Sequence, residues 1–212
     1  ASRRFPSYLA PAMTQLPELP LTLSRQEIRK MIRQRRRALT PEQQQEMGQQ
    51  AATRMMTYPP VVMAHTVAVF LSFDGELDTQ PLIEQLWRAG KRVYLPVLHP
   101  FSAGNLLFLN YHPQSELVMN RLKIHEPKLD VRDVLPLSRL DVLITPLVAF
   151  DEYGQRLGMG GGFYDRTLQN WQHYKMQPVG YAHDCQLVEK LPVEEWDIPL
   201  PAVVTPSKVW EW

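Results

Sequence analysis

The sequence predicts an α/β fold with three α/β/α layers around an open, mostly parallel, Rossmann-like sheet. Residues 66–71 form a continuous apolar run, as in a strand that is covered on both faces, and residues 141–146 predict a second buried strand. The succession of strand, helix and strand over residues 66–96 forms a βαβ unit, which requires a parallel strand pair and a right-handed crossover. A length of 212 residues, with 44% hydrophobic and 21% charged residues, suits a single domain, which we expect over residues 24–212.

The first 60 residues predict a tail and two helices. Residues 1–23 hold four prolines and show no periodicity, which indicates an irregular tail. Ser24 and Glu27 have the spacing of a capping box, so a helix is expected to begin after Ser24. Thr-Pro-Glu at residues 40–42 predicts the start of a second helix, which extends to about residue 57 before two prolines end it.

Strands and helices alternate over the rest of the chain. Gly90 is a typical stop for the helix of the βαβ unit. The remaining predicted elements are strands at residues 92–96, 106–109, 178–181 and 202–205, and helices at residues 79–89 and from 163 to about 174.

Charge is unevenly distributed along the chain. Residues 1–60 carry ten Lys and Arg against four acids, whereas residues 61–212 carry thirteen against eighteen. A helix at residues 25–37 holds most of the basic excess and is compatible with a nucleic-acid patch. A solvated helix face or a binder of small anions fits the near-neutral total charge at least as well.

Other features indicate a cytoplasmic protein that does not span a membrane. No apolar run reaches the length of a transmembrane helix, and the first residues lack the pattern of a secretory signal. Cys185 is the only cysteine, so no internal disulfide can form, as expected in a reducing compartment. Neither Cys185 nor the six histidines form a catalytic or zinc-binding pattern.

Half of the ten glycines lie in a segment that we call the glycine loop, residues 154–162. Glycines between a buried strand and a helix allow successive backbone N–H groups to approach an anion. Arg156 and Arg166 can bind phosphate oxygens, and Asp165 can hold a Mg²⁺ ion that bridges them. The segment is neither a Walker A loop nor a dinucleotide-binding turn, and a flexible surface turn is the alternative.

A second candidate site follows the first strand, in a segment that we call the acidic loop, residues 72–78. Its three acids are Asp74, Glu76 and Asp78. Ligands bind at the carboxyl ends of parallel strands, which is where this segment, residues 146–162 with the glycine loop, and the chain after Val204 are expected. Asp78 also has the position of a helix cap, whereas Glu76 has no evident capping role.

Residues 155–166 resemble the Arg-Leu-Gly-x-Gly-x-Gly-Tyr-Tyr-Asp signature of the 5-formyltetrahydrofolate cyclo-ligase family, also called methenyltetrahydrofolate synthetases. The resemblance extends over residues 24–207 and includes the basic helix, the acidic loop, Ile-His-Glu-Pro at 124–127 and Trp-Asp-Ile-Pro at 196–199. Phe163 stands where tyrosine is common, and Lys123 stands where a glycine usually precedes Ile-x-Glu-Pro.

The resemblance implies an enzyme that uses ATP and Mg²⁺ to close 5-formyltetrahydrofolate into 5,10-methenyltetrahydrofolate. By analogy, the formyl oxygen is phosphorylated by ATP, N10 of the folate attacks the activated carbon, and phosphate leaves. Such chemistry depends on positioning and charge neutralisation, so it requires no nucleophilic side chain.

The same resemblance implies roles for individual residues. Arg156 and Asp165 take the catalytic roles, Asp165 and Asp197 hold Mg²⁺, and Glu76 accepts hydrogen bonds from the pterin edge. ATP is expected to contact Arg25, Arg29, Arg156, Leu157, Gly158, Met159, Gly160, Gly161, Gly162, Phe163 and Tyr164. Folate is expected to contact Leu71, Glu76, Met159, Gly160, Gly161, Gly162 and Phe163.

Two other functions remain open at this point. A nucleic-acid-binding module would use the basic helix at residues 25–37 and leave the glycine loop without a role. An enzyme that handles phosphosugars or coenzyme A could use a similar scaffold, because fold alone does not determine function. We expect a monomer that binds a small folate, whose tail is polyglutamylated in some forms, and that binds neither nucleic acid nor membrane.

Overall fold

The computed structural model describes residues 23–212, so the tail predicted over residues 1–23 lies outside the described residues apart from Leu23. Within residues 23–212 the main sheet has eight strands. In order across the sheet they are β13 (Val209–Glu211), β12 (Ala202–Val204), β10 (Gln177–Tyr181), β7 (Val142–Thr145), β1 (Thr66–Ala68), β2 (Arg92–Leu98), β3 (Leu106–Tyr111) and β6 (Val134–Leu135).

The sheet is mostly parallel, as predicted. The strands from β12 through β10, β7 and β1 to β2 run parallel to one another. At the edges, β13 pairs antiparallel with β12, β3 pairs antiparallel with β2, and β6 pairs antiparallel with β3. β1 and β2 pair in parallel with Val67 opposite Val93, which confirms the predicted βαβ unit around the intervening helix.

The helices in the part of the chain that the structure describes are α1 (Arg25–Arg37), α2 (Pro41–Thr57), α3 (Pro59–Met63), α4 (Gln80–Arg88) and α5 (Phe163–Leu168). Both predicted N-termini are confirmed, since Ser24 caps α1 and Thr40 caps α2 in complete capping boxes. Gly90 follows α4 with a φ of 77°, in the left-handed region that favours glycine.

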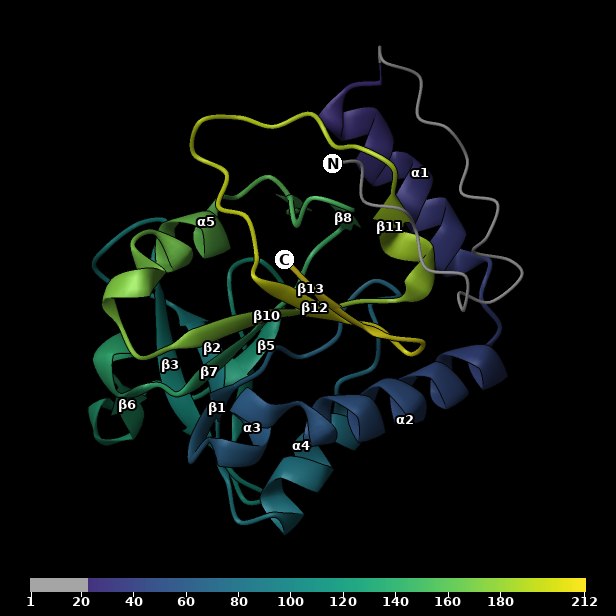
Figure 1. Cartoon of the computed structure of the whole chain (residues 1–212). Helices are drawn as coiled ribbons and strands as arrows, with labels where there is room; N and C mark the ends of the chain where they lie inside the picture. The colour runs from purple at the N-terminus through teal and green to yellow at the C-terminus, as the bar shows by residue number, and fades with distance from the viewer. Residues whose placement is uncertain (1–22) are drawn as a thin grey trace.

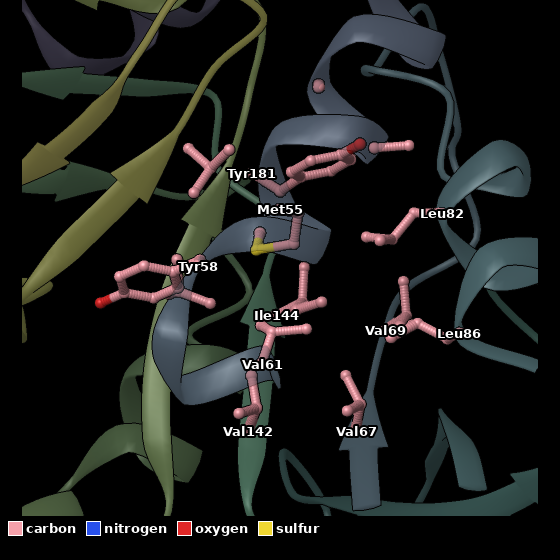
Figure 2. Packing of buried hydrophobic residues seen from close by; sticks show 14 of the residues in the cluster. Met55, Tyr58, Val61, Val67, Val69, Leu82, Leu86, Val142, Ile144 and Tyr181 are labelled. Atoms are coloured by element: carbon pink, nitrogen blue, oxygen red, sulfur yellow. The ribbon is translucent and has the colours of Figure 1, made fainter. Parts of the chain in front are cut away.

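α2, α3 and α4 cover one face of the sheet, and α1, α5 and a small second sheet lie on the other side (Figure 1). The core on the helical face is built from aliphatic side chains of the helices packed on those of the central strands (Figure 2). Its fully buried members include Met55, Val61, Val67, Leu82, Leu86 and Ile144.

The opposite face is covered by shorter elements. The small sheet consists of β11 (Leu187–Val188), β8 (Ala149–Asp151) and β9 (Arg156–Leu157). α1 packs on it through Ile28 and Ile32, which are completely buried against residues that include Leu157 and Val188. This contact brings the basic helix next to the glycine loop.

Some elements differ from the predictions. The helix expected to continue to about residue 174 ends at Leu168, because the chain turns through Asn170, whose φ is 59°. α3, the small sheet, β13 and a hairpin of β4 (Leu117–Met119) and β5 (His125–Pro127) were not predicted. These segments are too short to show a hydrophobic period.

Candidate active site

A cavity of about 490 Å³ lies at the carboxyl ends of β1, β2 and β7. Leu71, Phe73 and Glu76 line it on one side, and the residues from Gly158 to Asp165 line it on another. Two of the three segments predicted to carry the site therefore share one pocket. The third, which follows Val204, does not line this cavity.

The glycine loop depends on backbone conformations that glycine adopts without strain. Gly160 has a φ of 107°, and Gly162 has a φ of 71° at the position that precedes α5. A Cβ atom on Gly158 would lie 3.1 Å from the guanidinium group of Arg156. The glycines thus permit both the turns of the loop and the close approach of a buried arginine.

Arg156 belongs to the glycine loop, and its side chain is buried. Its Nε donates a hydrogen bond to the Pro146 carbonyl over 2.8 Å, and its Nη1 lies 3.7 Å from Oδ1 of Asp165. Burial lowers the pKa of Arg156, while the carboxylates of Asp165, Asp197 and Glu76 act in the opposite direction. Because it lines the cavity, this guanidinium can neutralise an anion bound there.

α1 contributes two further arginines to the cavity wall. Arg29 is 9% exposed, and its Nε donates to the Gly158 carbonyl over 2.7 Å. Arg25 forms a two-pronged ion pair with Asp197, with N···O distances of 2.6 and 3.1 Å. The predicted group of arginines is therefore assembled from residues far apart in the sequence.

The two carboxylates predicted to bind magnesium have different surroundings. Asp165 lines the cavity and accepts a hydrogen bond at Oδ1 from the backbone of Ile198 over 3.2 Å. Both oxygens of Asp197 contact Arg25, and only 2% of its side chain is exposed. In residues 23–212 no group of three or more His, Cys, Asp or Glu side chains could hold a metal ion.

This donor set still fits Mg²⁺, which commonly uses one or two carboxylates and completes its shell with phosphate oxygens and water. Asp165 has the accessible position, whereas Asp197 is neutralised by Arg25. The metal-binding roles of both residues stay predictions.

The acidic loop directs one of its three acids into the cavity. Oε1 of Glu76 accepts a hydrogen bond from the Phe73 amide over 2.9 Å, and burial raises the pKa of Glu76 to about 7. Asp78 instead accepts from the Gln80 amide at the start of α4, over 3.0 Å. The capping alternative therefore applies to Asp78 but not to Glu76.

Three further predicted contact residues, Met159, Phe163 and Tyr164, line the same cavity. Met159 is 57% exposed and Phe163 is partly buried. The ring of Tyr164 has its centroid 5.6 Å from the guanidinium carbon of Arg156, and burial raises the pKa of its hydroxyl. Leu157 is completely buried and does not line this cavity, so the geometry does not support its predicted contact with ATP. Arg166, a candidate phosphate ligand, instead donates to the carbonyls of Gly104 and Gly161.

The β4–β5 hairpin forms a wall of the cavity that the sequence reasoning missed. Asn120, Ile124 and Glu126 line the cavity, and Oε2 of Glu126 accepts from the Leu98 amide over 3.0 Å and from Nδ2 of Asn120 over 3.1 Å. Residues 124–127 belong to a motif of the family, but the sequence predicts no role for them in the site. Lys123 turns the hairpin with a φ of 59°, a conformation that glycine adopts more easily.

Several cationic side chains of α1 are directed into the protein rather than into solvent. Arg25 and Arg29 line the cavity, and Arg36 is only 4% exposed. These positions weaken the hypothesis of a nucleic-acid surface. No helix among residues 23–212 is long and apolar enough to cross a bilayer.

Comparisons with known proteins agree on one family. The pattern of the 5-formyltetrahydrofolate cyclo-ligase family matches residues 22–206. A Haemophilus influenzae protein named 5-formyltetrahydrofolate cyclo-ligase is 53% identical over 179 residues, which cover 84% of this chain and 96% of that protein. A Mycolicibacterium smegmatis protein of the same name is 31% identical and covers 87% of this chain and 95% of its own length.

Solved structures agree as well. The NMR structure of a 5,10-methenyltetrahydrofolate synthetase from Aquifex aeolicus superposes with a TM-score of 0.76 at 28% identity. The match covers 89% of this chain and 93% of that one. The α/β fold predicted from the sequence is therefore confirmed.

Proposed function

Since the chain belongs to the 5-formyltetrahydrofolate cyclo-ligase family, we propose that it converts 5-formyltetrahydrofolate to 5,10-methenyltetrahydrofolate with ATP and Mg²⁺ and releases ADP and phosphate. An enzyme of this family is a ligase that forms a carbon–nitrogen bond. The observation that carries the proposal is the single cavity, which has Arg25, Arg29 and Arg156 on its walls together with Glu76.

The reaction proceeds in two steps. The formyl oxygen attacks the γ-phosphorus of ATP, ADP leaves, and the formyl carbon is left as an iminium phosphate. N10 of the folate then forms a bond to that carbon and loses its proton to water, and the carbon–oxygen bond breaks as phosphate departs. Phosphorylation is needed because the oxygen of a formamide is otherwise a poor leaving group.

The cationic side of the cavity suits the triphosphate. Arg156 is held by the Pro146 carbonyl and Arg29 by the Gly158 carbonyl, so their charges are oriented before a ligand arrives. Preorganised charges stabilise the transition state of phosphoryl transfer without reorganisation of the site. Backbone amides from Gly158 to Gly162 add donors for phosphate oxygens. Arg25 and Tyr164, which also line the cavity, complete the ATP-binding set.

The other side of the cavity suits the folate. Leu71 and Phe163 offer apolar surface to the ring system, and Met159 lies at an exposed position of the rim. An ionised Glu76 only accepts hydrogen bonds, so it complements the adjacent N–H donors on the pterin edge. The Phe73 amide holds one of its oxygens in place.

Asp165 is the residue that would hold Mg²⁺, because its side chain lines the cavity beside Arg156. When bound, Mg²⁺ supplies positive charge to the phosphate oxygens during transfer. Asp197 supports the same region by orienting Arg25, with which it forms an ion pair at 2.6 Å. It serves as a second metal ligand only if Arg25 moves away.

We further propose that the enzyme acts in the cytoplasm as a monomer. A single cysteine, partly buried and with a pKa raised to about 11 by burial, is unsuited to disulfide formation.

The test is spectroscopic. The protein is mixed with 5-formyltetrahydrofolate and Mg²⁺, with and without ATP, and the near-ultraviolet absorbance of the methenyl product is followed. We expect a signal that requires ATP and is lost when Mg²⁺ is chelated. Folded protein without an ATP-dependent signal would contradict the proposed activity.

A further inference from the structure

The last turns of α1 contact the acidic loop. Nη2 of Arg37 lies 3.1 Å from Oδ1 of Asp74, and Arg36 and Arg33 lie 3.8 and 3.9 Å from Oδ2 of the same residue. Asp74 and Gly75 form a left-handed turn, with φ values of 50° and 76°. Three cations therefore surround the only charged group at the tip of this turn.

Arg36 differs from the other two arginines because it is buried. Only 4% of its side chain is exposed, compared with 65% for Arg37 and 37% for Arg33. Glu76 and Asp74 attract its charge, and a Cβ atom on Gly75 would lie 3.5 Å from Cβ of Arg36. The backbone of the acidic loop thus packs directly on Arg36.

His183 also contacts this turn. This residue follows β10, is completely buried, and has its Nε2 3.2 Å from the Gly75 carbonyl. Burial lowers the pKa of His183 to about 4, so its imidazole is neutral near pH 7. Since a carbonyl can only accept, the proton of this neutral ring is on Nε2.

Arg36 is poorly suited to a purely stabilising role. Nε of Arg36 is buried without a hydrogen-bond partner, which is unfavourable for a charged group. Burial also lowers the pKa of Arg36. Apolar side chains of similar volume would fill the same space at a lower free-energy cost.

We propose that Arg36 is a positioning residue for folate binding: with His183 it holds the acidic loop so that Glu76 faces the cavity. This inference rests on the proposed function, because it assigns the folate side of the cavity to Glu76. Arg25 and Arg29 belong to the first turns of the same helix and contact Asp197 and the glycine loop instead. The first turns of α1 therefore serve the ATP side of the cavity, and its last turns serve the folate side.

The charge of Arg36 also affects the ionisation of Glu76. The charged or titratable groups around Glu76 are Arg36 on α1, Asp74 in its own loop, Arg156 on β9 and Tyr164 on α5. Burial raises the pKa of Glu76, Arg36 and Arg156 lower it, and Asp74 raises it. Removing the charge of Arg36 should therefore move the ionisation of Glu76 to higher pH.

The experiment measures KM for both substrates in Arg36→Met over pH 6 to 9. We expect the KM for 5-formyltetrahydrofolate to rise about tenfold, the loss of one charge-assisted contact, while the KM for ATP changes less than twofold. The acid limb of kcat/KM for folate should move to higher pH. Arg36→Lys keeps the charge and should return that limb toward its original position.

Arg35→Met is the matched control. Arg35 belongs to the same turn of α1 and donates to the Cys185 carbonyl over 3.2 Å, but its hydrogen bonds do not involve the acidic loop. This variant should leave both KM values unchanged. An unchanged folate KM in folded Arg36→Met, or an equal rise of both KM values, would overturn the inference.

Asp74→Asn provides a second test that does not alter the interior. It weakens the contact with the arginines, and asparagine tolerates the left-handed conformation at this position. The folate KM should rise at pH 8, but the acid limb should move to lower pH because a negative charge near Glu76 is lost. A shift in the same direction as Arg36→Met would contradict the electrostatic argument. Absence of ATP-dependent turnover in the unaltered protein would instead reject the proposed function.

Discussion

The glycine loop and the acidic loop face the same cavity but are held in place by different means. The glycine loop takes its shape from its own residues, since Gly160 and Gly162 adopt positive φ values and Gly158 makes room for Arg156. The acidic loop also turns through positive φ values, at Asp74 and Gly75, but remote side chains hold this turn, because Arg37 contacts Asp74 and His183 contacts Gly75. The glycine loop can therefore be identified from the sequence. The position of the acidic loop can be seen only in the folded structure.

The largest effect is expected on the glycine-loop side. Arg156→Ala removes a buried cation that lines the cavity, so kcat/KM should fall about 100-fold or more, as for the loss of a preorganised donor. The measurement is the initial rate of methenyl product formation, with thermal unfolding of both proteins as a check on folding. Cys185→Ser is the control and should retain full turnover, so comparable losses in both variants would contradict the assigned site.

An intermediate effect is expected on the acidic-loop side. Glu76→Gln replaces the acceptor-only carboxylate, and the KM for 5-formyltetrahydrofolate should rise about tenfold at pH 8. At pH 6 the difference should shrink, because the pKa of Glu76 is about 7 and the unaltered residue is then mostly protonated. Steady-state kinetics at the two pH values check this, and a penalty that does not depend on pH would contradict it.

The same substitution should increase stability at neutral and higher pH. The pKa of Glu76 rises from 4.5 to about 7 on folding, so the folded state binds more protons between these values. The free energy of unfolding contributed by this group therefore falls as pH rises from 4.5 to 7 and stays low above that range. A glutamine at this position does not ionise, so the Glu76→Gln variant keeps its stability as the pH rises. The Tm of the variant should exceed that of the unaltered protein at pH 8 but not at pH 4.5.

The smallest effect is expected from backbone strain in the glycine loop. Gly160→Ala places a side chain on a residue with a φ of 107°, which should cost about 1–2 kcal/mol and raise the KM for ATP several-fold. Its Cβ would meet Arg29 only at ordinary contact distances from 3.7 Å, so strain rather than collision is the cause.

Gly90→Ala is the matched control for this prediction. Gly90 has a φ of 77°, and its added Cβ would meet nothing within 4 Å. It lies beyond α4, outside the cavity lining, so it should lose comparable stability while the KM for ATP stays constant. If Gly160→Ala and Gly90→Ala changed the KM for ATP equally, the effect of Gly160→Ala would come from reduced stability of the whole protein and not from the glycine loop.

Much of the fold was predictable because its signals are local. Capping boxes at Ser24 and Thr40 marked the helix starts, and continuous apolar runs marked the central parallel strands. The antiparallel edge strands β13 and β6 were not predicted, because neither lies in a longer apolar run of the kind that marks β1 and β12. The predicted length of α5 is wrong, because the helix ends at Leu168. Asn170 then adopts a left-handed conformation, which the sequence does not mark with a glycine.

The amino-acid order alone established the α/β class and the glycine loop, and through its motif it identified the family. Conformational preferences act over a few residues, so glycine spacing and hydrophobic periods can be recognised in the sequence. The pairing of Arg25 with Asp197, the burial of Arg36 behind the acidic loop and the wall formed by the β4–β5 hairpin arose only on folding. Each joins residues that packing of distant elements brings together, and no local preference encodes such a contact.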